Sequence, residues 1–97
     1  MNKNNLPFNF DPLWAESLTL YMKSKKAMAG MTYADISEKL ESTLGIIQSP
    51  ENIKTKFLNG NFGAQFFIQT MYVMEVDKVK VKKIIEKHKE IKKSASQ

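Results

Sequence analysis

Paired signals for the start and the end of helices constrain the fold of this chain more than any other feature. Asp11-Pro12 and Ser49-Pro50 each place a side-chain acceptor before a proline, which suits the first helical position because the amide it lacks has no partner there. Thr32 and Asp35 form a variant of the capping box, with Asp in place of the usual Glu or Gln. A glycine, the usual residue just after a helix end, closes each of the three segments: Gly30, Gly45 and Gly60. The sequence therefore predicts three helices between these signals.

Apolar side chains at helical spacing predict which side of each helix faces the core. The expected core positions of the three segments are Trp14, Leu18, Tyr21, Met22, Tyr33, Ile36, Leu40, Leu44, Ile53, Phe57 and Gly60. A fourth helix is expected from Gly63 or Ala64 to Glu75, and it is apolar nearly all round, so we expect it to be the most buried element. Its apolar residues are Phe66, Phe67, Ile68, Met71, Tyr72, Val73 and Met74. Packing of Phe57 with Phe67 should fix the third helix against the fourth.

The last segment opens with KVKVK, residues 78–82, an alternation that a strand also shows. A single strand without a partner is not stable in an otherwise helical chain. The apolar residues of this segment fit one face of a helix instead: Val81, Ile84, Ile85, His88 and Ile91. We therefore expect a fifth helix over about 77–93, and the predicted fold is all-α, a compact bundle of four to five helices in one domain.

The residue types exclude several classes of function. There is no cysteine, which rules out disulfides, a thiol nucleophile and Cys-ligated zinc, and a lone His88 is more often a surface or interface residue than a metal ligand. No glycine-rich phosphate loop, nucleophile with a base, or suggestive carboxylate pair occurs, so neither enzymatic activity nor a cofactor is expected. The sequence also lacks the apolar run of a signal peptide or of a membrane span. We expect a soluble cytoplasmic protein that does not enter a membrane.

Positive charge is concentrated near the C-terminus, because residues 78–93 carry a net charge of +6 and residues 1–77 a net charge of −1. Three interpretations of this lysine-rich helix stay open. Its lysines are the solvated face of a helix packed on the bundle, or the segment has a function: its lysines contact phosphates, or Ile84, His88 and Ile91 form a dimer seam. A membrane-surface helix is the third, against which the absence of Trp, Phe and Leu on the apolar face argues.

The second and third helices carry a family resemblance. MTYADISEKL, residues 31–40, resembles the opening of the helix-turn-helix in the phage-repressor-like (lambda repressor-like) superfamily, where a Gly-Leu-Thr start leads to a Leu-Ala-Glu-Lys-Leu type of segment. Ser37 stands at the small position of that segment, which suits a close crossing of the next helix. More narrowly, TY, NI, KF, G, F and FFIQ in TYADISEKL…ENIKTKFLNGNFGAQFFIQ are similar to a family of small, uncharacterised bacterial helix-turn-helix domains. Two features depart from it: residues 45–50 make a longer turn than the usual one of about three to four residues, and Asn59 stands where an arginine is expected.

The resemblance, which covers about residues 15–76, implies a helix-turn-helix domain at 11–76, between a flexible segment at 1–10 and a basic helix and tail at 77–97. It implies a sequence-specific regulator of transcription that binds double-stranded DNA, a repressor that occludes a promoter as a homodimer. The residues expected to contact DNA are Ser49, Glu51, Asn52, Lys54, Thr55, Lys56, Asn59 and Asn61.

Within this set, amide and hydroxyl side chains can read base edges, whereas lysines mainly contact phosphate. We therefore expect Asn52 and Thr55 to contact bases and Lys54 and Lys56 to contact phosphates. All fifteen basic residues are lysine, and the absence of arginine, the commonest reader of guanine, favours an A·T-rich site.

Two alternatives to DNA binding remain. The polar side of the third helix is simply solvated, or the bundle is an adaptor that binds another protein through the fifth helix or the aromatic edge, because one fold serves many functions.

Overall fold

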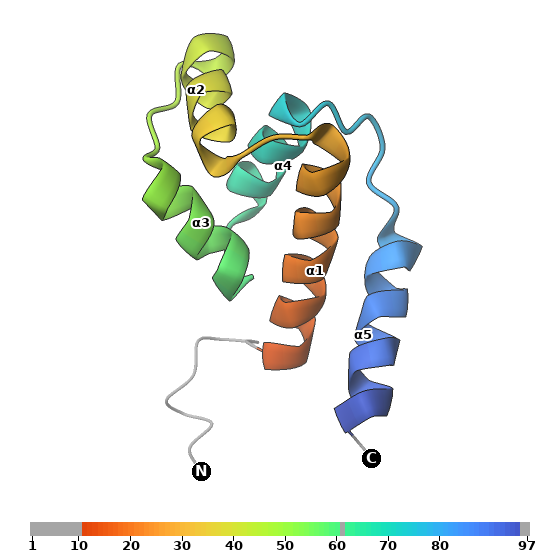
Figure 1. Ribbon diagram of the computed structural model, residues 1–97. Helices are drawn as coiled ribbons and strands as arrows, with labels where there is room; N and C mark the ends of the chain where they lie inside the picture. The colour runs from red at the N-terminus through yellow and green to blue at the C-terminus, as the bar shows by residue number, and fades with distance from the viewer. Residues whose placement is uncertain (1–10, 61, 96–97) are drawn as a thin grey trace.

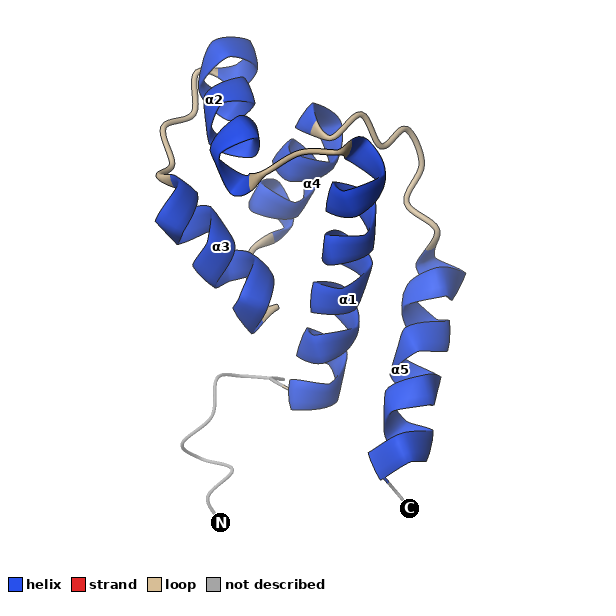
Figure 2. Ribbon diagram, in the orientation of Figure 1, coloured by secondary structure: helices blue, strands red, loops and turns tan. Residues whose placement is uncertain are grey.

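The computed structural model describes residues 11–60 and 62–95 and contains five helices (Figure 1). They are α1 (Pro12–Ala29), α2 (Tyr33–Leu44), α3 (Pro50–Asn59), α4 (Ala64–Val73) and α5 (Val81–Ala95). Figure 2 shows helices and loops only over the described residues, which confirms the predicted all-α bundle. The segment 1–10, which was expected to be flexible, lies outside the described residues, as does Asn61.

Side-chain hydrogen bonds cap the first three helices at the predicted residues. The Asp11 carboxylate accepts from the Leu13 amide at 2.9 Å. Thr32 and Asp35 complete the capping box: the Thr32 hydroxyl accepts from the Asp35 amide at 3.0 Å, and the Asp35 carboxylate accepts from the Thr32 amide at 2.9 Å. The Ser49 hydroxyl accepts from the Asn52 amide at 3.1 Å. These local signals therefore fix three helix starts.

The core lies where α1, α2, α3 and α4 meet. α1 packs against α3 and α5, while α2 packs against α3 and α4. The largest side chains without solvent exposure, or nearly so, are Tyr21, Phe57, Met22, Ile36, Leu40, Ile53 and Val73. The predicted core-facing sides of α2 and α3 are therefore confirmed at Ile36, Leu40, Ile53 and Phe57.

α4 has four buried residues in ten, the largest share of the described helices, which agrees with the prediction that it is the most buried element, but it is not covered on all sides. α4 ends at Val73, two residues before Glu75, and Ile68 and Tyr72 are 65% and 60% exposed. Phe66 rather than Phe67 meets Phe57, with ring centroids 6.4 Å apart in an edge-on arrangement. Phe67 is half-buried and stacks on Phe62. α4 has more apolar residues than its neighbours can cover, so one side of it faces solvent.

Two other residues expected in the core lie at its edge. Leu44 is 39% exposed because it occupies the last position of α2, which projects from the bundle (Figure 1). Trp14 is 41% exposed and lies on the side of α1 that faces α5, away from the core shared with α3 and α4. There it stacks on His88 with ring centroids 3.6 Å apart. α1 thus has two packed sides, of which the apolar pattern predicted one.

α5 starts at Val81, four residues later than expected, and a non-helical connector (residues 74–80) leads into it. α5 runs antiparallel to α1 along its length (Figure 1). Its half-buried residues are Ile84, Ile85, Lys87, His88 and Ile91. The amide of Lys80 donates to the Tyr21 hydroxyl at 3.0 Å, which ties the connector to α1. The basic segment is therefore a helix packed on the bundle, as one of the three interpretations expects.

Candidate nucleic-acid interface

The C-terminal end of α3 is held tightly against α1. Gly60 adopts a left-handed conformation with φ of 61°, and a Cβ atom there would overlap the backbone carbonyl of Ala15. One turn further along α1, the Thr19 hydroxyl donates to the Phe57 carbonyl at 2.7 Å. A glycine therefore allows the two helices to cross in backbone contact, and a buried hydrogen bond fixes their alignment.

The other end of α3 is fixed through the turn that precedes it. This turn spans residues 45–49, and the Ser37 hydroxyl donates to the carbonyl of Gln48 at 2.6 Å. Beneath the helix, Ile53 and Phe57 have no solvent exposure, and the Tyr33 and Phe57 rings form an edge-to-face pair with a centroid distance of 5.3 Å. The extended turn is therefore anchored to α2, and α3 is held along its length.

The structure brings most of the predicted DNA-contacting residues to one exposed surface, which we call the outer face of α3. The members of this face are Glu51, Asn52, Lys54, Thr55, Leu58 and Asn59, all exposed. Leu58, which is 48% exposed, was not among the predicted contacts. We did not predict a contact at Leu58 because it is apolar, although its position directly after buried Phe57 places it on the exposed side of the helix. The outer face is thus a polar surface with one apolar side chain.

Two predicted contact residues have structural partners of their own. Ser49 is exposed, but its hydroxyl caps α3 through Asn52. Lys56 is half-buried, and its ammonium lies 5.5 Å from the centroid of the Phe66 ring. Such a cation–π contact holds the charge at the protein surface. Of the two lysines predicted to contact phosphate, Lys54 is therefore the one that the structure leaves exposed.

The charge of the outer face is small. Glu51 lies in the first turn of α3, where a carboxylate stabilises the helix but repels phosphate. The lysine-rich α5 does not add to this face, because α3 and α5 pack on different sides of α1 (Figure 1). The lysine-rich helix and the outer face therefore lie on different sides of the molecule. Sequence alone could not reveal this separation.

Other kinds of site find little support in the described residues. No three His, Asp or Glu side chains within 11–60 and 62–95 gather closely enough to hold a metal ion. None of the helices in this part of the chain is both long and apolar enough to cross a membrane.

Residues 14–79 match a family profile described as "Domain of unknown function (DUF6471)". The match runs from the first turn of α1 into the connector and stops before α5. No curated protein and no solved structure matches the chain at a significant level. The helices that build the outer face of α3 therefore lie within the matched region, and α5 lies beyond it.

Proposed function

We propose that this chain, which belongs to the DUF6471 family of domains of unknown function, binds double-stranded DNA through the outer face of α3. The observation that carries the proposal is the division of α3 into a fully buried side and a polar, exposed side. Ile53 and Phe57 hold the helix rigidly, while Asn52 and Thr55 point away from the core. The major groove of B-DNA, about 12 Å wide, admits one helix presented in this way.

The chemistry of the outer face fits the recognition of base pairs. An Asn side chain can pair bidentately with adenine, and a Thr can contact a base edge or a thymine methyl group. Exposed Leu58 is suited to apolar contact with the same methyl group. Lys54 is the exposed lysine of the outer face. Binding through this face therefore releases few counterions from DNA and gains little free energy from their release. We therefore expect an A·T-rich target and a shallow dependence of affinity on salt.

The role that follows from the sequence resemblance is a transcriptional repressor in the bacterial cytoplasm, which occludes a promoter by binding two half-sites about one helical turn apart. The dimer seam expected from Ile84, His88 and Ile91 would require α5 to move. These side chains are half-buried on the side of α5 that lies on α1, so a second copy reaches them only if α5 leaves α1.

The test is selection of bound duplexes from a random pool, followed by titration of variants on the selected site. Asn52→Ala and Thr55→Ala should each relax preference at one base pair and cost about 1 to 3 kcal/mol, while Lys54→Ala should weaken all sequences alike and lower the salt slope by about 1. Lys82→Ala on α5 is the control, and it should change neither quantity on a short duplex. Equal losses for all three α3 variants on selected and scrambled DNA would refute the assignment.

A protein-binding adaptor is the second candidate, and one observation favours it. Ile68 and Tyr72 lie one turn apart on α4 and are 65% and 60% exposed, and a pair of large apolar side chains in water is typical of a protein contact surface. Selection from the random pool separates the two functions. DNA binding predicts enrichment of one sequence, whose duplex is then retained in a shift assay, and an adaptor enriches none.

A further inference from the structure

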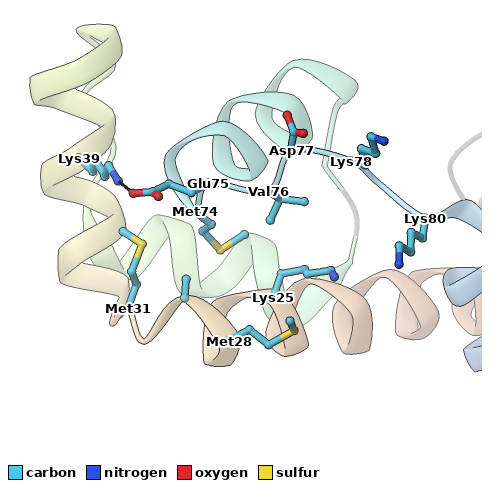
Figure 3. A pocket seen from close by; sticks show the side chains of 11 residues that line it. Lys25, Met28, Met31, Lys39, Met74, Glu75, Val76, Asp77, Lys78 and Lys80 are labelled. Carbon is cyan, nitrogen blue, oxygen red and sulfur yellow. Dashed lines mark hydrogen bonds and ion pairs between the residues drawn. The ribbon is translucent and has the colours of Figure 1, made fainter.

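A groove opens on the side of the molecule between the C-terminal half of α1, α2 and the connector (Figure 3). Its volume is about 790 Å³. Small-molecule sites in proteins commonly enclose about 300 to 1,000 Å³ and combine apolar walls with a few polar groups. The groove is therefore large enough for a small ligand, and its lining indicates which kind.

Methionine dominates the apolar part of the lining. Met28 and Met31 come from the end of α1 and the turn after it, and Met74 and Val76 come from the connector across the groove (Figure 3). Met28 is 75% exposed, although it is a large apolar side chain. Methionine is flexible and polarisable and packs against ligands of irregular shape. This floor suits an apolar chain or ring.

Two lysines stand at the end of the groove near Tyr21. The ammonium of Lys25 lies 5.2 Å from the centroid of the Tyr21 ring, and the backbone of Lys80 is bonded to the Tyr21 hydroxyl. Figure 3 shows both lysine side chains reaching toward the opening between α1 and the connector. Neither lysine takes part in the two ion pairs of the described residues, which join Lys39 to Glu75 and Lys83 to Glu86. Two lysines at the same end of a groove, neither of them paired with a carboxylate, favour an anion at that end.

The acidic residues of the groove do not neutralise these lysines. The Glu75 carboxylate pairs with Lys39 at 2.9 Å at the far rim, and the Asp77 carboxylate points away from the methionines (Figure 3). Glu75 has a φ of 61° and is the one non-glycine residue with positive φ in the described chain. This is the usual conformation of the residue after a helix end, and it lets the Val76 amide donate to the Met71 carbonyl at 2.9 Å. The bend directs the connector from α4 over the groove.

We propose that this groove binds a small amphipathic anion, a carboxylate carried by an alkyl chain. The carboxylate lies between the ammonium groups of Lys25 and Lys80, and the chain lies along Met28, Met31 and Met74. The proposal does not depend on DNA binding, because the groove lies apart from the outer face of α3 and shares no residue with it.

The test uses amide chemical shifts of the full chain during titration with three probes: decanoate, neutral 1-decanol and acetate. Decanoate should shift the amides of residues 25–31 and 74–80, whereas the alcohol and acetate, which lack the charge or the chain, should bind at least about tenfold more weakly. Equal binding of decanoate and decanol would show that the lysines have no role. Shifts centred on Ile68 and Tyr72 would show that the chain only coats the exposed side of α4. Either result overturns the proposal.

Variants then test where the carboxylate and the alkyl chain of decanoate bind. Lys25→Gln and Lys80→Gln should each weaken decanoate about tenfold, and Met28→Ser, at a largely exposed position, should weaken it about fivefold without unfolding the protein. Lys54→Gln on α3 is the matched control, since it removes the same charge far from the groove. If the control weakens decanoate as much as Lys25→Gln, binding reflects net charge alone and the assigned site is wrong.

Discussion

Replacing Gly60 with alanine tests the tight crossing of α1 and α3 that holds the outer face in place. Two separate terms destabilise the variant. A left-handed alanine costs about 1 to 2 kcal/mol, and the new Cβ overlaps the carbonyl of Ala15 and comes within 2.8 Å of the Thr19 hydroxyl oxygen. Forcing an extra methyl group into a packed site costs about 1 to 3 kcal/mol more. The total of about 2 to 5 kcal/mol is a large part of the roughly 5 to 15 kcal/mol that stabilises a domain of this size.

Gly45 supplies the matched control. It has a φ of 69°, close to that of Gly60, but nothing lies within 4 Å of the position that a Cβ would take. Gly45→Ala should therefore show the backbone term alone, about 1 to 2 kcal/mol. The difference between the two variants isolates the contact with α1.

Urea denaturation of both variants measures these free energies, and thermal melts should show a shift of about 4 to 8 °C for each kcal/mol. Gly60→Ala should melt well below Gly45→Ala. If the two variants lose the same stability, the backbones of α1 and α3 are not in contact at Gly60, and the account of how α3 is positioned fails.

Two further perturbations probe the capping box and the attachment of α5. Hydrogen bonds from Thr32, with a smaller effect of Lys26, hold the pKa of the Asp35 carboxyl below its usual value of 3.8. The ionised carboxylate therefore stabilises the folded protein fully above that value, and this stabilisation is lost as the pH falls through the lowered pKa. Asp35→Ala should consequently be less stable than the wild type at about pH 7 and nearly equal to it at about pH 2 by urea denaturation; a gap that does not change with pH would contradict this assignment. His88→Ala removes the ring stacked on Trp14, the single tryptophan, and should cost about 0.5 to 1.5 kcal/mol and shift tryptophan emission to the red. Lys89→Ala, on the exposed side of α5, should leave the spectrum unchanged, and an unshifted His88→Ala spectrum would mean that α5 does not cover Trp14.

Helix boundaries were predictable from the sequence because caps act over three or four residues. The side chains of Asp11, Thr32 and Ser49 bond amides within that distance, so their effect does not depend on the rest of the fold. The inward side of α3 was predictable for a similar reason, since Ile53 and Phe57 recur at the helical period and its remaining positions are mostly polar.

The features that the sequence did not predict depend on contacts between distant residues. α4 is apolar on all sides, so periodicity could not tell Phe66 from Phe67 or show that Ile68 faces water. The stacking of Trp14 on His88 joins residues from the two ends of the chain, and no local pattern connects them. The separation of the lysines of α5 from the outer face likewise follows from how the helices pack.

The hydrogen bond from the Lys80 amide to the Tyr21 hydroxyl means that hydrogen exchange at this amide measures local opening of the structure. Lys80 lies in the non-helical connector, where an unbonded amide exchanges its hydrogen with water rapidly. The rate at which this amide takes up deuterium therefore reports how often the connector lifts from α1, while the buried helical amides exchange only in larger openings. Local release of α5 and global unfolding of the bundle are thus two processes with separate rates, recorded in the same protein in a single exchange experiment.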